Sequence, residues 1–82
     1  MTDNEILNKL QEITRTVLGR NDIVLTKRTK FDDLGVNSFV MVQLVCEIEN
    51  EFDIEIPNAV IVTIKNVPAA VRYIKKRINL KR

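Results

Sequence analysis

Residues 31–39 read Phe-Asp-Asp-Leu-Gly-Val-Asn-Ser-Phe and place a serine directly after a glycine-containing loop. The fourteen residues after Ser38 contain no glycine or proline, so we predict that a helix begins at Ser38, with this serine as its N-cap. A serine in the first turn of a helix has an exposed hydroxyl beside unsatisfied backbone N–H groups, and this position tolerates an attached phosphate. No base is available nearby to activate it, so any covalent chemistry at Ser38 must be catalysed by another protein.

The helix predicted after Ser38 is apolar on more than one side. One face is expected to be buried and consists of Met41, Leu44, Val45, Ile48 and Phe52. A second apolar set falls on or towards the outer side and consists of Phe39, Val40, Val42 and Cys46. These residues, like residues 59–62, either belong to the core or are exposed and mark a protein contact.

Two further helices are indicated by apolar residues at helical spacing. The first spans residues 3–18, with a capping box formed by Thr2 and Glu5 and a C-terminal cap at Gly19. The last begins near Asn66 and Pro68. Residues 19–37 form a connection longer than an ordinary loop, which is therefore either structured by packing or functional.

Residues 60–64 are five β-branched residues in a row, Val-Ile-Val-Thr-Ile. Their propensity favours a strand, which could pair with residues 23–26. Periodicity and propensity leave this segment undecided.

Composition excludes several classes of function. The 82 residues suit one small domain without the walled cleft of most enzymes, and the absence of histidine removes histidine-dependent triads and zinc sites. A lone Cys46 cannot form an internal disulfide or a cysteine-rich metal site, which fits a reducing compartment. No apolar run is long enough to span a membrane. The N-terminus, residues 1–5, lacks the basic segment followed by an apolar one that is typical of a secretory signal. We therefore expect a cytoplasmic protein that binds no metal and no membrane.

Charge is strongly segregated along the chain. Residues 32–56 carry seven acids and no base, whereas residues 57–82 carry seven bases and no acid. The basic run over residues 75–82 has no interleaved aromatic residue and is interpreted as cations at a helix C-terminus. We expect no nucleic-acid partner.

The serine-containing stretch and the helix after it resemble the acyl carrier protein and peptidyl carrier protein family. Leu34-Gly35 and Ser38 match the family pattern, while Asn37 stands where Asp is commonest and Phe39 where Leu is commonest. The match continues without a gap through Glu49, Glu51, Phe52, Ile56-Pro57, Ile64, Val67, Ala69-Ala70 and Tyr73-Ile74. It covers about residues 3–77, nearly the whole chain.

The resemblance implies an all-α fold: a four-helix bundle with a long connection between the first two helices and a short third helix, in a single carrier domain over residues 1–82. Residues 60–64 would then be the end of the short helix and the turn after it. The implied cofactor is 4′-phosphopantetheine, transferred from coenzyme A to Ser38, with cargo held as a thioester. The chain would be a monomeric carrier and not an enzyme. Its partners would be a pantetheinyl transferase, an acyl- or aminoacyl-loading ligase or adenylation enzyme, and synthases or transferases.

One departure from the family concerns the surface that partners meet. Fatty-acid-synthesis carriers are strongly acidic along the second helix, whereas Val40 and Gln43 occupy the outward positions here. Apolar contact should replace much of the charge steering, which is more similar to carriers serving peptide synthetases, polyketide assembly or aminoacyl transfer. The candidate partner-binding residues are Asn37, Phe39, Val40, Val42, Gln43, Cys46, Glu47 and Ile61. The alternative function is an unmodified helical adaptor that binds partners through the same helix.

Overall fold

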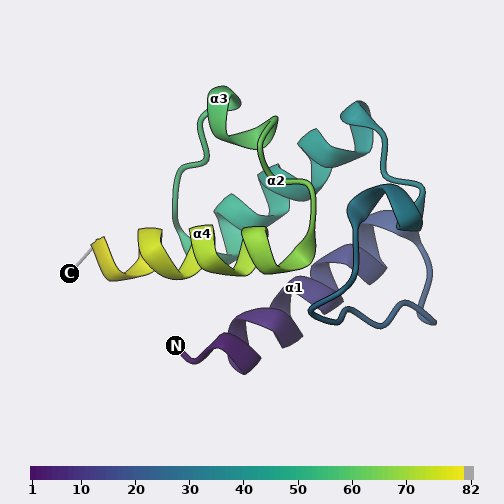
Figure 1. Cartoon of the computed structure of the whole chain (residues 1–82), viewed down its shortest axis with the longest axis horizontal. Coiled ribbons are helices and arrows are strands. Elements are labelled where there is room, and N and C mark those ends of the chain that lie inside the picture. The colour runs from purple at the N-terminus through teal and green to yellow at the C-terminus, as the bar shows by residue number, and fades with distance from the viewer. Residues whose placement is uncertain (81–82) are drawn as a thin grey trace.

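The computed structural model describes residues 1–80 and contains α1 (Asp3–Leu18), α2 (Ser38–Phe52), α3 (Asn58–Ile61) and α4 (Val67–Leu80), with a 3₁₀ turn, η1, at Phe31–Leu34. α1 packs against both α2 and α4, and the short α3 packs against α2 (Figure 1). The residues described contain no strand, which confirms the all-α bundle with its long first connection and short third helix. None of these helices has both the length and the apolar character needed to cross a membrane.

The core is assembled from one stripe of each long helix. The fully or nearly fully buried helical residues are Ile6, Leu10, Leu44, Val45, Ile48, Phe52, Val67, Ala70 and Ile74. Met41, Ile13, Val17, Val71 and Ile78, assigned to the same faces by their spacing, are only partly buried and pack against this core. Thr14 is buried in α1, and its hydroxyl donates to the Leu10 carbonyl at 2.7 Å, which satisfies the one buried polar side chain of the described core.

The long connection between α1 and α2 is structured by packing. Ile23 and Leu25 are buried, and side chains of α1 hold the backbone on either side of them. Arg15 Nε donates to the Ile23 carbonyl at 2.8 Å, and the Leu25 amide donates to Gln11 Oε1 at 2.9 Å. The 19-residue span therefore has a defined path along α1 and does not behave as an open loop.

The run of β-branched residues at 60–64 does not form a strand. α3 ends at Ile61, the chain turns through Val62 and Thr63, and the buried side chain of Ile64 anchors the turn. Extended pairing is limited to one antiparallel bridge between Lys30 and Asn66, so the pairing with residues 23–26 does not occur. Burial of Ile64 in the core decides the conformation against local propensity.

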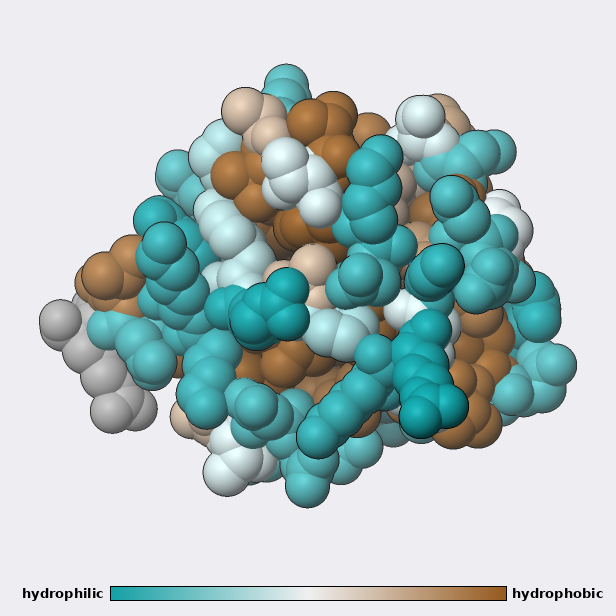
Figure 2. Space-filling view, viewed as in Figure 1, coloured by the Kyte–Doolittle hydropathy of each residue, from teal (hydrophilic) through white to brown (hydrophobic). Residues whose placement is uncertain are grey.

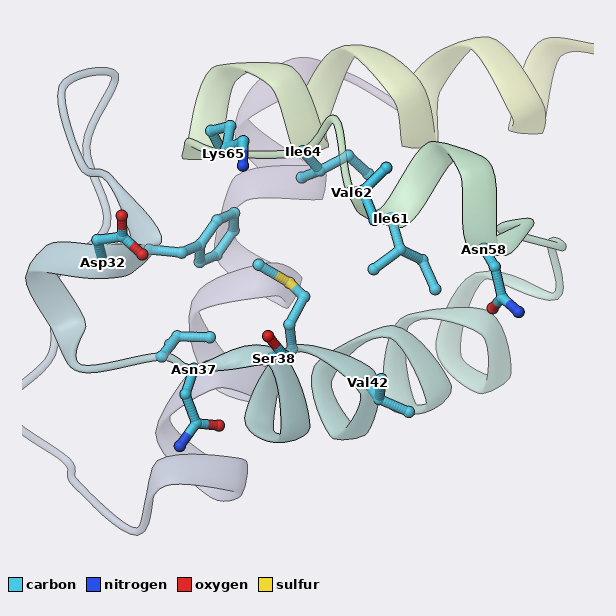
Figure 3. A pocket seen from close by; sticks show the side chains of 12 residues that line it. Asp32, Asn37, Ser38, Val42, Asn58, Ile61, Val62, Ile64 and Lys65 are labelled. Atoms are coloured by element: carbon cyan, nitrogen blue, oxygen red, sulfur yellow. The ribbon is translucent and has the colours of Figure 1, made fainter.

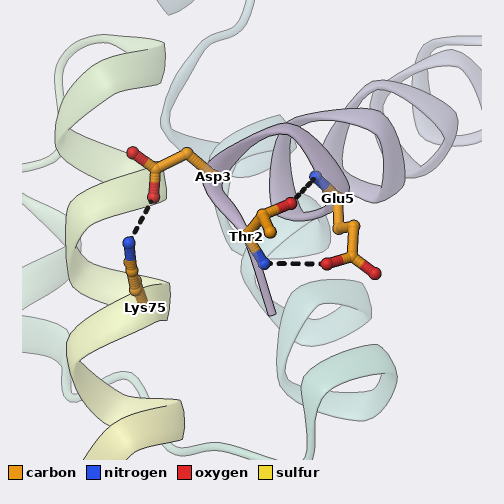
Figure 4. Close-up of polar contacts among 4 residues, drawn as sticks. All are labelled: Thr2, Asp3, Glu5 and Lys75. Carbon is orange, nitrogen blue, oxygen red and sulfur yellow. Dashed lines mark hydrogen bonds and ion pairs between the residues drawn. The ribbon is translucent and has the colours of Figure 1, made fainter.

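The helix ends follow the sequence closely. Thr2 and Glu5 form the expected capping box, and Gly19 ends α1 in the left-handed conformation with φ 66°. Asn66 caps α4, because its Oδ1 accepts a hydrogen bond from the Ala69 amide at 2.9 Å. Lys75 Nζ and Asp3 Oδ1 form an ion pair at 2.9 Å that joins α4 to the start of α1 (Figure 4). The basic run of α4 continues into residues 81 and 82, which lie outside the described residues.

We expect Thr2→Ala to reduce the free energy of unfolding by about 1 kcal/mol, because it removes the side-chain cap of the Glu5 amide. The Thr2 amide, which donates to Glu5 Oε1 at 2.8 Å, is the main cause of the lowered pKa of Glu5. A lowered folded-state pKa contributes stability above the unfolded value and loses it as the pH falls through the folded value. Thr2→Ala keeps this backbone amide, so the lowered pKa of Glu5 and its contribution to stability should be largely retained in the variant.

Thermal unfolding at several pH values and an NMR titration of Glu5 measure both effects. Asn8→Ala, at an exposed position of the same helix, is the control and should not reduce stability. An unchanged free energy of unfolding in Thr2→Ala would contradict the assigned capping box.

Candidate functional site

The loop before Ser38 is fixed by two buried side chains, Phe31 and Val36. Between them η1 ends at Gly35, whose φ of 77° is in the left-handed region that favours glycine. The Gly35 amide donates to the Asp32 carbonyl at 3.0 Å, and the Val36 amide donates to the Phe31 carbonyl at 3.2 Å. Ser38 is thus presented at the surface by a loop with a defined conformation.

The N-cap of α2 is Asn37, and the prediction that Ser38 is the cap was wrong. Asn37 has extended backbone angles, its Oδ1 accepts from the Val40 amide at 2.9 Å, and its carbonyl accepts from the Met41 amide at 2.9 Å. Asn and Ser are comparable caps, so their side-chain chemistry does not decide between neighbouring positions. The extended backbone at Asn37 makes Ser38 the first helical residue.

This shift of one position leaves hydrogen-bonding groups free at the start of α2. Within residues 1–80, the Ser38 hydroxyl forms no hydrogen bond, and the amides of Ser38 and Phe39 have no acceptor. The side chain of Ser38 is exposed, so water and an attached group can both reach these donors. The helix N-terminus, which has no acidic residue in its first turn, favours an anion at this position.

An apolar groove of about 450 Å³ lies beside Ser38, between α2 and the segment from α3 to α4 (Figure 3). Ser38 and Val42 lie on the α2 side, and Ile61, Val62 and Ile64 lie across from them. Met41, also on α2, contributes to the lining, and Asp32 and Lys65 are the charged residues among those that line it. A group attached to Ser38 therefore has an apolar surface within reach.

Exposed apolar side chains surround this groove. The fractional exposure is 72% for Phe39, 50% for Val42 and 69% for Val62. Figure 2 shows apolar side chains gathered over α3 on the face that it presents. Three large apolar side chains with this much exposure near one groove are a candidate contact surface for a partner protein. We call Phe39, Val42 and Val62 the apolar patch.

The predicted partner-binding residues fall into three groups. Asn37, Val42 and Ile61 line the groove with Ser38. Phe39, Gln43, Cys46 and Glu47 are exposed on α2 outside the groove lining. The outward position predicted for Val40 is wrong, because this side chain is half-buried and packs against the core.

Sequence reasoning missed several residues of the groove. Lys65 was not assigned to any site, Met41 was assigned to the buried face, and Val62 was left open between the core and a protein contact. The exposure of Val62 follows from the turn after α3, which places Ile64 in the core and Val62 outside. The one available signal was the match of Ile64 to the family pattern, which fixes the register of this turn.

The comparisons with known proteins agree with this geometry. The family described as "Phosphopantetheine attachment site" matches residues 8–74. An acyl carrier protein of Chlorobium phaeovibrioides is 40% identical over 78 residues, which are 94% of this chain and 100% of that protein.

The chain belongs to the acyl carrier protein family.

A second relative supports the same assignment, and two solved structures match the fold. The acyl carrier protein of Guillardia theta is 38% identical over 79 residues, covering 95% of this chain and 98% of that protein. The crystal structure of an acyl carrier protein from Thermotoga maritima matches the fold with a TM-score of 0.89 at 22% identity, covering 98% of this chain and 94% of that one. The solution structure of the holo acyl carrier protein from Geobacter metallireducens matches with a TM-score of 0.84 at 26% identity, covering 93% and 88% of the two chains.

Membership of the acyl carrier protein family identifies the chain as a carrier with covalently attached 4′-phosphopantetheine, and not an enzyme. The start of α2 fits such a group. It offers an exposed hydroxyl without a hydrogen bond and two backbone N–H groups that can donate to a phosphate, all on one helical turn.

The assignment of Asn37 as the cap predicts that alanine substitution costs more stability at Asn37 than at Ser38. Asn37→Ala should reduce the free energy of unfolding by roughly 0.5 to 2 kcal/mol, because it removes the acceptor of the Val40 amide. Ser38→Ala should change it by less than about 0.5 kcal/mol, because no hydrogen bond is lost and the side chain is exposed. Urea unfolding followed by circular dichroism measures both. A larger loss for Ser38→Ala than for Asn37→Ala would contradict the assignment of Asn37 as the cap.

Proposed function

We propose that Ser38 is the residue that carries the 4′-phosphopantetheine, and that residues 1–82 act as one carrier domain that presents an acyl group to partner enzymes. The observation that carries this proposal is the spare hydroxyl of Ser38 at the first helical position of α2, beside amide groups without acceptors. Ser38 is also the only serine in the sequence. The six threonines offer no hydroxyl in an equivalent position after the Leu34-Gly35 loop.

The residues around Ser38 would orient the group. The amides of Ser38 and Phe39 can donate to the phosphate oxygens, and the dipole of α2 stabilises the negative charge by roughly 0.3 to 1 kcal/mol. Asn37 continues to cap the Val40 amide, so attachment does not disrupt the start of the helix. When attached, the group supplies a terminal thiol that holds an acyl chain as a thioester.

The chemistry of the groove supports an apolar cargo. Met41, Val42, Ile61, Val62 and Ile64 present aliphatic side chains next to Ser38. Transfer of apolar surface from water into this groove stabilises a hydrocarbon by roughly 25 cal/mol per Å² buried. An acyl or polyketide chain would gain from this contact, whereas a free aminoacyl group would gain less.

The apolar patch supports partner recognition by contact more than by charge steering. Phe39 and Val42 precede any acid on α2, whose first acidic residue is Glu47. Partners of this chain would be a pantetheinyl transferase, a loading ligase or adenylation enzyme, and a synthase or transferase, each with an apolar area near its active-site entrance. Such recognition suits polyketide, peptide or aminoacyl-transfer systems better than a fatty-acid synthase that reads an acidic helix.

Incubation with coenzyme A and a broad-specificity pantetheinyl transferase should add the mass of one phosphopantetheine to the chain. Peptide mapping by mass spectrometry should place it on Ser38, and Ser38→Ala should remain unmodified. Ser38→Thr is the matched variant that keeps a hydroxyl. An unchanged mass of the wild type, with a known carrier modified in the same tube, would reject Ser38 as the attachment site and favour the unmodified adaptor.

Phe39→Ala and Val42→Ala should raise the KM of the same transferase for the carrier by about tenfold, because loss of a central apolar contact costs at least 1 kcal/mol at a protein interface. Val24→Ala is the control, because Val24 is 65% exposed but lies in the first connection. Equal KM values for all three variants and wild type would remove the assigned role of the apolar patch in transferase docking.

A further inference from the structure

A cluster of cations lies next to the groove and extends from Lys65 onto a face that the carrier function does not use. Five basic side chains are exposed there: Lys27, Arg28, Lys30, Lys65 and Arg72. Among the residues that the structure describes, none of these five is within 4.0 Å of a carboxylate oxygen. We call this set the basic surface. Figure 2 shows hydrophilic side chains gathered over α4 and the loop next to it.

Backbone hydrogen bonds hold the basic surface together. The Val67 amide donates to the Thr29 carbonyl at 3.0 Å, and the Phe31 amide donates to the Lys65 carbonyl at 3.2 Å. These bonds fix the loop that contains Lys27 and Lys30 against the turn before α4. Cations far apart in sequence are therefore kept close together, and their mutual repulsion is not relieved by an internal partner.

A recess of about 240 Å³ lies between the start of α1 and the first turns of α4. Leu7, Val67 and Val71 give it an apolar lining, and Lys27 and Arg72 contribute its cations. The only acid that lines it, Asp3, is paired with Lys75 at 2.9 Å. Apolar atoms are visible between the hydrophilic side chains in this region of Figure 2.

The shape of the recess separates two possible occupants. An anionic bilayer is contacted best by apolar side chains that project beyond the cations, as in an interfacial helix. Here the apolar residues are recessed: Val67 is buried, and Leu7 and Val71 are partly buried against the core. A hollow with an apolar floor and cations around it fits one apolar side chain flanked by carboxylates, which is the chemistry of an acidic protein segment.

We propose that the basic surface and this recess form a docking site for an acidic segment of a partner protein, with an apolar side chain of that segment inserted between α1 and α4. The site does not include Ser38, so it goes beyond the carrier function and is present whether or not the serine is modified. Lys65 also lines the groove beside Ser38, so a segment bound here lies next to that groove. The first turn of α4, which contains no acid, adds to the positive potential.

The test is an NMR titration of the ¹⁵N-labelled chain with a synthetic peptide, Glu-Asp-Glu-Leu-Glu-Asp-Glu, blocked at both ends. We expect amide shifts at Leu7, Lys27, Val71 and Arg72. Replacing the leucine by glycine should weaken binding by about tenfold, and replacing the acids by their amides should abolish it. Binding that does not depend on the leucine would overturn the role of the recess.

Charge-reversal variants locate the site. Lys27→Glu and Arg72→Glu should each weaken peptide binding at least about fivefold, while Arg20→Glu, with the same change in charge at the far end of α1, should not. Thermal unfolding checks that each variant is folded. Equal weakening by all three would show a general charge effect and overturn the site. A last experiment mixes the protein with vesicles of phosphatidylglycerol and phosphatidylcholine and sediments them. If the protein sediments with the vesicles but does not bind the leucine peptide, the proposal is overturned in favour of a membrane-binding surface.

Discussion

The start of α2 depends on the hydrogen bond between Asn37 Oδ1 and the Val40 amide. Because Asn37 supplies the cap, the neighbouring serine enters the helix with its hydroxyl unused and with two amides still without acceptors. A serine that served as the cap would have its oxygen committed to the helix. The family commonly has Asp where this chain has Asn37, and both side chains offer an oxygen at the same distance from the backbone. The capping function is kept here while one negative charge beside the position proposed for the phosphate is removed.

The loss of that charge belongs to a wider pattern in the electrostatics of the chain. α2 has no acid before Glu47, and the cations are concentrated on α4 and on the loop that pairs with its start. The area around Ser38 is consequently rich in exposed apolar side chains, Phe39, Val42 and Val62, and the basic surface lies next to it. Apolar contact acts only at close range and does not attract a partner over a distance. Charges placed outside the contact can attract the partner and remain in water when the complex forms, so they carry no desolvation cost.

Local signals in the sequence were sufficient for the helices and most of their ends. The capping box at Thr2 and the glycine after α1 depend on residues within one turn and are found as predicted. The last helix begins next to Asn66 as predicted, and the structure adds that Asn66 is its cap. The cap of α2 and the outward position of Val40 were wrong because both depend on how the preceding loop enters the helix. Ser38 was proposed as the attachment site from the sequence and stays a prediction, whereas the groove beside it could not be predicted. Its lining by Lys65 and Val62 follows from the position of the turn after α3, which is decided by burial of Ile64.

The connection between α1 and α2 contributes residues both to the groove beside Ser38 and to the basic surface. Its final part, anchored by Phe31 and Val36, presents Ser38, and the bridge between Lys30 and Asn66 fixes the basic surface a few residues earlier. Phe31 takes part in both, since its side chain lines the groove while its amide binds the Lys65 carbonyl. A change in the position of Phe31 must therefore move the groove and the loop of cations together. If a partner binds at the basic surface as proposed, that binding and occupation of the groove would be coupled through Phe31 wherever each favours a different position of this residue.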